Sequence, residues 1–170
     1  MKQNEQADRM RRHLERLYAD ADRDRDGYLC WEEIRGFQRS LTRRYRYLRN
    51  TTALRPDQFL SQGGGDCEDW ALVTCGLLRY WGWESYVGAF FPPDGGDGHA
   101  LCLVRWAEPP RGFDCLRVAG GVSTWDGKAV RPGYYVPVDY ELVGGTSNAV
   151  RPGWRLKCFY TPEAIYGLQM

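Results

Sequence analysis

The 170-residue sequence is poor in histidine and has almost no net charge, with two histidines and a formal charge of +1. The balanced charge argues against a dedicated nucleic-acid binder. No apolar run is long enough to cross a bilayer, and the polar first residues lack the apolar stretch of a signal peptide. We therefore expect a cytoplasmic protein that has neither a membrane partner nor a nucleic-acid partner.

The six cysteines form no C-x-x-C pair and show no zinc-finger spacing. Thiols in a cytoplasmic protein stay reduced by default, although an even number would also suit disulfides after export by another route. No internal repeat or low-complexity tract is present. What the sequence does contain is a 43% hydrophobic fraction, which is enough for a packed core. Its length suits one domain, or one domain with a small appendage.

Two N-terminal segments, 8–21 and 31–48, carry apolar residues at helical spacing on either side of an acidic loop. We expect them to form a helix-loop-helix unit over residues 1–50. Asn50 and the two threonines after it, followed by Pro56, are expected to end the second helix and start a linker.

The second unit is expected over residues 51–170. The long apolar stretch that ends before Gly82 predicts a buried helix from Cys67 to Trp81. Strand-like segments separated by turns follow it. The expected strands are 84–91, 99–106, 113–118, 134–140 and 154–160. One central helix followed by antiparallel strands is an α+β pattern.

The acidic loop at 22–33 matches the EF-hand pattern at each diagnostic position. Ca²⁺ prefers oxygen ligands, and aspartates at alternate positions with a glutamate at the twelfth would supply them. Gly27 would permit the sharp turn. The expected ligands are Asp22, Asp24, Asp26, the backbone carbonyl of Tyr28, and Glu33. The alternative is an acidic loop that only caps a helix. Only one such loop is visible, whereas EF-hands usually come in pairs. Because its four acidic ligands would repel one another without a cation, we expect a structural or regulatory calcium ion that stabilises the N-terminal helices.

Cys67 follows three glycines and begins the predicted buried helix. A helix N-terminus stabilises a thiolate through its free N–H groups and its dipole. A thiolate nucleophile needs a proton partner, and His99 at the start of an apolar strand is the candidate. Taken alone, Cys67 could instead be a structural cysteine and His99 a turn residue. Their combination in this order favours a catalytic pair.

A carboxylate should orient the imidazole of such a pair. Asp139 is preferred because the apolar strand before it leads directly into it, while Asp114 and Asp126 are rivals. The reaction would also need an oxyanion hole. The backbone N–H of Cys67 is one donor, and Gln62 is a speculative second donor whose alternative is an ordinary loop residue.

Four short motifs lie in order along residues 60–145: Gly65-Asp66-Cys67-Glu68-Asp69, Leu77-Leu78-Arg79, Gly98-His99-Ala100 and Val138-Asp139. In these motifs the sequence resembles the transglutaminase-like superfamily. It is most similar to the bacterial transglutaminase-like cysteine proteinases of the LapG type. The resemblance implies a papain-like core in which the cysteine helix packs on an antiparallel sheet. It also implies Cys67 as nucleophile, His99 as general base and acid, and Asp139 as the orienting group.

Two features depart from that family. Its aspartate usually lies on the strand right after the histidine strand, about fifteen residues beyond the histidine and so near Asp114 here. Asp139 therefore requires an inserted hairpin at about 108–132. The EF-hand is also outside the family core. In LapG-type proteases the acidic residues beside the cysteine bind calcium. By that resemblance Asp66, Glu68 and Asp69 could form a second calcium site, or they could simply favour a helix N-terminus.

Together these features predict a calcium-binding, papain-like thiol enzyme. It would act on peptide or glutamine amide bonds of a protein or peptide substrate through a thioester, and the resemblance favours a cysteine protease. The alternatives are a transglutaminase or deamidase, and a non-catalytic calcium-responsive binding module on the same scaffold. The oligomeric state is not predicted.

Overall fold

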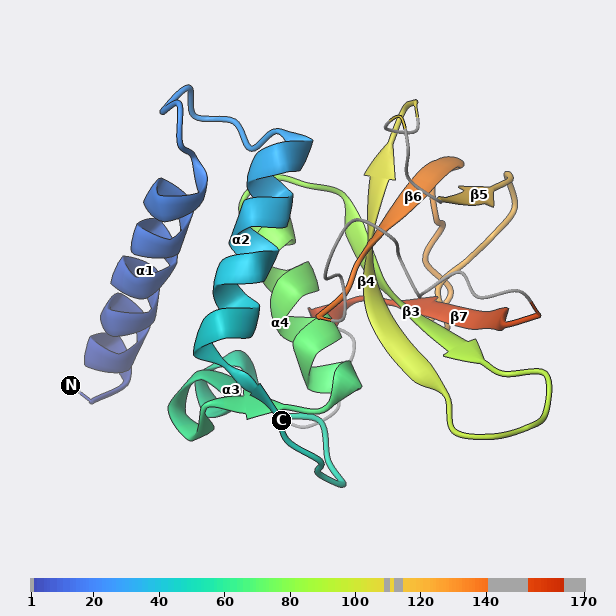
Figure 1. Cartoon of the computed structure of the whole chain (residues 1–170), viewed down its shortest axis with the longest axis horizontal. Helices are drawn as coiled ribbons and strands as arrows, with labels where there is room; N and C mark the ends of the chain where they lie inside the picture. The colour runs from blue at the N-terminus through green and yellow to red at the C-terminus, as the bar shows by residue number, and fades with distance from the viewer. Residues whose placement is uncertain (1, 109–110, 112–114, 141–152, 164–170) are drawn as a thin grey trace.

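The computed structural model describes residues 2–108, 111, 115–140 and 153–163. Within these described residues, helices α1 to α4 lie on one side of a five-stranded sheet (Figure 1). The helices are α1 (Lys2–Ala21), α2 (Trp31–Arg44), α3 (Pro56–Gln62) and α4 (Cys67–Tyr80). The strands are β1 (Arg46–Tyr47), β2 (Gly64–Gly65), β3 (Ser85–Phe91), β4 (His99–Trp106), β5 (Leu116–Val118), β6 (Gly133–Val138) and β7 (Arg155–Tyr160). This mixture of helices and antiparallel sheet is the α+β class that the sequence predicts.

The five-stranded sheet has the order β5-β6-β4-β3-β7, and every neighbouring pair is antiparallel. Cys102 on β4 lies opposite Val138 on β6. Because the two strands run in opposite directions, the residue after Val138 reaches the edge where β4 begins. The register therefore brings the end of β6 to His99.

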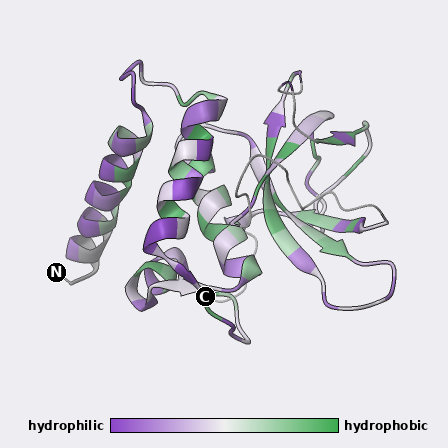
Figure 2. Cartoon of the chain, viewed as in Figure 1, coloured by the Kyte–Doolittle hydropathy of each residue, from purple (hydrophilic) through white to green (hydrophobic). Residues whose placement is uncertain are grey.

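Helix α4 is apolar because it is covered on two sides. It lies between α2 and the sheet in Figure 1, and it contacts β3 and β4. Leu72, Val73 and Leu78 are almost completely buried in this layer. Burying one such side chain stabilises the fold by about 1.5–3 kcal/mol relative to leaving it exposed. In Figure 2 the hydrophobic colour accordingly gathers on the strands and on α4, while α1 is largely hydrophilic.

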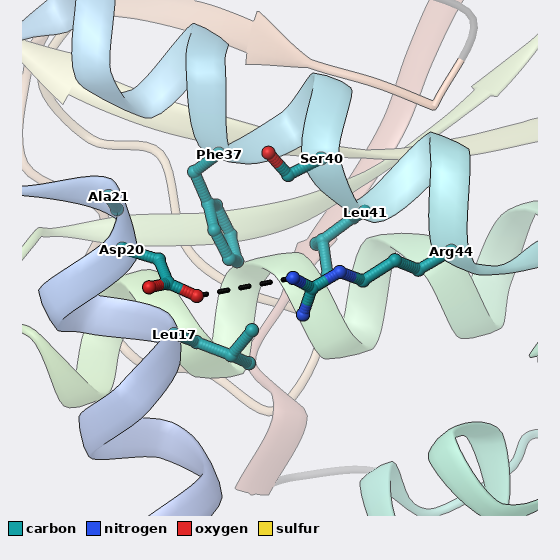
Figure 3. Close-up of a pocket in the computed structure, with 7 residues that line it drawn as sticks. All are labelled: Leu17, Asp20, Ala21, Phe37, Ser40, Leu41 and Arg44. Atoms are coloured by element: carbon teal, nitrogen blue, oxygen red, sulfur yellow. Dashed lines mark ion pairs between the residues drawn. The ribbon is translucent and has the colours of Figure 1, made fainter.

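The N-terminal helices share the core with the rest of the chain. Leu17 of α1 and Phe37 of α2 belong to the same buried cluster as Leu72 of α4. A cavity of roughly 370 Å³ lies between α1 and α2, lined by Leu17, Asp20, Ala21, Phe37, Ser40, Leu41 and Arg44 (Figure 3). Arg44 and Asp20 form a 4.0 Å ion pair across it.

Two expectations for residues 31–62 are wrong. Helix α2 ends at Arg44 instead of continuing to residue 48, and the supposed linker contains helix α3, which begins with Pro56. Residues 46–47 leave the helix because they pair in parallel with Gly64 and Gly65. A Cβ atom on Gly64 would lie 1.9 Å from the carbonyl oxygen of Arg46, so this close pairing requires glycine.

The other elements lie close to their predicted bounds. Helix α4 ends one residue earlier than expected, and β3 and β4 match within one residue. Strand β5 begins at Leu116 and leaves Cys115 outside it, while residues 113–114 of the expected strand lie outside the described residues. None of the described helices is long and apolar enough to cross a membrane.

Candidate active site and calcium loop

Cys67 is the first residue of α4, as the sequence predicts. Asp66 precedes it as the N-cap, and its carboxylate accepts hydrogen bonds from the backbone N–H groups of Glu68 at 3.1 Å and Asp69 at 3.2 Å. Such a cap fixes the first turn and satisfies N–H groups that would otherwise lack partners. The partly buried Cys67 thiol is therefore held at the positive end of a well-formed helix.

Asp69 is completely buried, and its carboxylate is surrounded by donors. It accepts from the backbone N–H of Leu54 at 2.7 Å, from that of Asp66 at 2.9 Å, and from the side-chain amide of Asn50. These bonds tie the segment before α3 to the start of α4. Asp69 thus helps to fix the position of Cys67 at the start of α4.

The three acids beside Cys67 do not gather into one cation site. Glu68 accepts a hydrogen bond from the Tyr160 hydroxyl at 3.3 Å, and burial raises the pKa of Glu68. Burial, with repulsion from Asp69 and Glu68, raises the pKa of Asp66 to about 6. Among the described residues, the only three acidic side chains with one oxygen each within 4.8 Å of the others are in the N-terminal loop.

His99 and Asp139 meet at the edge where β4 begins. His99 Nε2 lies 2.6 Å from Asp139 Oδ2, and the Asp139 side chain is only 4% exposed. The inserted segment at 108–132 lies between β4 and β6, so it lets Asp139 follow the strand that pairs directly with β4. Asp126 instead bonds the Thr124 hydroxyl in a turn. Asp114 lies outside the described residues.

The pKa of His99 reflects two opposing influences. Burial lowers it, but hydrogen bonding to Asp139 and to Cys67 outweighs burial and raises the pKa to about 10. The imidazole is therefore protonated at neutral pH. Since Nε2 bonds Asp139, Nδ1 is the ring nitrogen left for the Cys67 thiol. An imidazolium in this position stabilises a thiolate.

Two tyrosines that sequence reasoning missed complete the surroundings of this group. The Tyr140 ring centroid lies 6.0 Å from that of His99 and 5.2 Å from that of Tyr47, against which it stacks. Tyr140 could have been noticed because it directly follows Asp139. Tyr47 gave no signal, since it lies twenty positions before Cys67 in a segment read as helix.

Gln62 does not take the place expected of a second oxyanion donor. Its side-chain amide donates to the carbonyl oxygen of Gly64 at 2.8 Å. It therefore braces the glycine segment that leads to Cys67.

The acidic loop between α1 and α2 brings three of its predicted ligands together. One oxygen each from Asp22, Asp24 and Glu33 lies within 4.8 Å of the others. Gly27 has φ of +81°, which supplies the sharp turn. Asp26 is outside this set, because its carboxylate accepts the backbone N–H of Tyr28 at 2.8 Å.

Backbone donors hold the loop carboxylates in place. Asp22 accepts from the N–H groups of Asp26 at 3.1 Å and Gly27 at 3.0 Å, while Glu33 accepts from Cys30 at 3.0 Å. The Cys30 bond is the main reason that the pKa of Glu33 lies below its ordinary value. Converging ionised carboxylates fit a hard divalent cation such as Ca²⁺.

The sequence matches no protein family model, and no curated protein is significantly similar to it. Among solved structures, calcium-bound LapG from Legionella pneumophila matches with a TM-score of 0.56 at 14% identity, over 89% of this chain and 74% of that chain. EGTA-treated LapG from the same organism matches with a TM-score of 0.54 at 14% identity, over 88% and 70%. The chain has a LapG-like fold. The match is longer than residues 51–170, so it extends into the N-terminal helices.

Proposed function

We propose that this chain is a calcium-binding, papain-like thiol enzyme that cleaves peptide bonds with Cys67, His99 and Asp139. The observation that carries this proposal is the 2.6 Å contact between His99 and Asp139 next to the Cys67 thiol at a helix N-terminus. The LapG-like fold supports it, because the sequence motifs independently resemble LapG-type cysteine proteinases.

In the proposed reaction the Cys67 thiolate attacks the amide carbonyl carbon. The His99 imidazolium then gives its proton to the departing amine, which leaves a thioester on Cys67. The neutral imidazole next removes a proton from water, and the resulting attack releases the acid and restores the thiol pair. Buried Asp139 holds the ring so that one nitrogen faces sulfur throughout.

The acceptor decides which enzyme this is. With water the thioester gives a protease or a deamidase, and with an amine it gives a transglutaminase. We favour peptide-bond hydrolysis, with a protein or peptide substrate, because the fold neighbours are LapG structures.

We further propose that residues 1–50 form an EF-hand that binds one Ca²⁺. Asp22, Asp24, Asp26 and Glu33 with the Tyr28 carbonyl would hold the ion, after Asp26 exchanges its present backbone bond for the metal. One of the fold neighbours is described as calcium-bound, which supports the choice of cation. The bound ion would neutralise the clustered carboxylates and stabilise α1 and α2 against the core of residues 51–170.

The test is the pH dependence of iodoacetamide labelling at each cysteine, read by peptide mapping, in wild type, His99→Ala and the control His13→Ala. We expect Cys67 to react fast well below the ordinary thiol pKa of about 8.5, and to lose this in His99→Ala only. Cys158, also partly buried, is the internal reference. If Cys67 reacts no faster than Cys158, the enzyme proposal fails and a non-catalytic binding module is the better account.

A further inference from the structure

Tyr47 is brought to Cys67 by the short parallel pairing of β1 with β2. It lies opposite Gly65, two residues before Cys67. The backbone N–H of Arg46 donates to Gly63 and that of Leu48 donates to Gly65, both at 2.9 Å. The backbone on both sides of Tyr47 is therefore fixed against the segment that leads into α4.

Burial raises the pKa of the Tyr47 phenol, and Cys67 lies near enough to act on that pKa through both its thiol and its backbone N–H. The ring stacks on Tyr140 at an interplanar angle of 29°, and Tyr140 in turn packs edge-on against His99. Tyr47 remains 46% exposed, so a substrate can reach it.

The proposed reaction needs two donors at the place where the carbonyl oxygen gains negative charge. The Cys67 N–H is one of them. Gln62 is not available, because its amide bonds Gly64. Tyr47 lies opposite Gly65, two residues before Cys67, and is therefore close to this first donor.

We propose that Tyr47 is the second oxyanion donor of this site, an inference that rests on the proposed thiol chemistry. When a substrate carbonyl oxygen enters, the Cys67 N–H and the Tyr47 O–H both donate to it. The sulfur–carbon bond forms as the carbonyl electron pair moves onto oxygen, and the return of that pair expels the leaving group. Tyr47 keeps its proton throughout. Burial and the nearby Cys67 and Asp66 raise the pKa of Tyr47, so the phenol stays a donor at neutral pH.

The test is acylation of Cys67 by p-nitrophenyl acetate, followed as the burst of p-nitrophenolate, in wild type and Tyr47→Phe. This substitution removes the hydroxyl but keeps the ring that stacks on Tyr140. We expect the burst rate constant to fall by about 10²–10³-fold with little change in half-saturation. Iodoacetamide alkylation of Cys67 should stay unchanged, because displacement at a saturated carbon forms no oxyanion.

Tyr80→Phe is the matched control, because this ring is exposed near the end of α4. It should change neither rate. The inference is overturned if Tyr47→Phe acylates as fast as or faster than wild type, or if its alkylation falls in parallel with its acylation. In either case the proposed function is still supported, provided that Cys67 of the wild type reacts with both reagents. A wild-type Cys67 that reacts with neither reagent would overturn both.

Discussion

Helices α2 and α4 begin in the same way and differ in what surrounds their acidic residues. In each, a carboxylate at the third helical position accepts the backbone N–H of the residue before the helix. Glu33 accepts from Cys30 at 3.0 Å, and Asp69 accepts from Asp66 at 2.9 Å. This reciprocal arrangement is a capping box, which sequence alone can suggest.

The remaining partners separate the two helix starts. The Asp69 carboxylate accepts two further hydrogen bonds, from the Asn50 side chain and from the backbone N–H of Leu54. Glu33 also accepts from the backbone N–H of Arg23 at 2.7 Å, but unlike Asp69 it shares its site with one oxygen each of Asp22 and Asp24. Like charges in one place repel, whereas donors neutralise a carboxylate without a metal. The same local motif thus serves as a finished structural network at α4 and as a candidate cation site at α2.

The largest loss of stability is expected when the hydrogen-bond network around Asp69 is broken. Asp69→Ala should destabilise the fold by about 3–5 kcal/mol, because partly buried donors on three residues would lose their partner and the buried carboxylate would leave a gap. Urea unfolding followed by circular dichroism measures this, with exposed Glu15→Ala as a control that should stay within about 0.5 kcal/mol of wild type. A loss no larger than the control's would show that the network contributes nothing.

Calcium should stabilise the protein through the α2 site only. At a hundredfold excess over Kd, binding one ion to the folded state raises stability by about 2.7 kcal/mol. Thermal unfolding with Ca²⁺ or EGTA should show this increment in wild type and in Glu32→Gln, but not in Glu33→Gln. Isothermal titration should give one ion per chain. A second ion would contradict the comparison and point to Asp66, Glu68 and Asp69.

The two helix starts should respond oppositely to pH when EGTA is present. The pKa of Asp66 is raised to about 6 from 3.8, so the folded state holds this proton more tightly and stability falls as pH rises between these values. Asp66→Asn, which keeps a good N-cap, should therefore gain stability at pH 7–8 and none below pH about 4.

Glu33 has a lowered pKa, so its contribution is present above its unfolded pKa and is lost as pH falls. Glu33→Gln should thus lose stability at neutral pH, with the loss shrinking in acid. Urea unfolding across this pH range checks both variants. Parallel pH profiles for the two substitutions would disprove the contrast.

The smallest effect is expected away from both helix starts. Arg44 and Asp20 bridge α1 and α2 at 4.0 Å, but both side chains are more than half exposed (Figure 3). A double-mutant cycle with Arg44→Ala and Asp20→Ala should give a coupling of about 0–1 kcal/mol that vanishes at high salt. A larger coupling would mean that surface charge, rather than the loop carboxylates, holds these helices together.

The sequence predicted the elements that have strong local patterns. Helix α4 was visible as a long apolar run, and the main strands as apolar segments between turns. Helix α3 was missed because seven residues are too few for a period to show. The end of α2 was misplaced because Tyr45 and Leu48 continue the helical spacing. Pairing with the Gly64 backbone then overrides that local preference.

In the candidate site, too, residues in strong local patterns could be predicted, and contacts between distant segments could not. His99 and Asp139 could be predicted to meet, since each lies at the end of an apolar strand. Tyr47, Asn50 and Leu54 could not be connected to Cys67 or Asp69, because each of these contacts joins residues fifteen or more positions apart. Only the folded arrangement reveals them.

The sheet order has a consequence for how the protein is made. Strand β3 lies between β4 and β7, yet β4 follows it immediately, while β7 begins at Arg155. As the chain leaves the ribosome, one edge of β3 therefore waits without a partner until residues 155–160 have emerged. Open strand edges pair readily with other chains. The nascent protein is most prone to aggregate in that interval, during which His99 and Asp139 are synthesised.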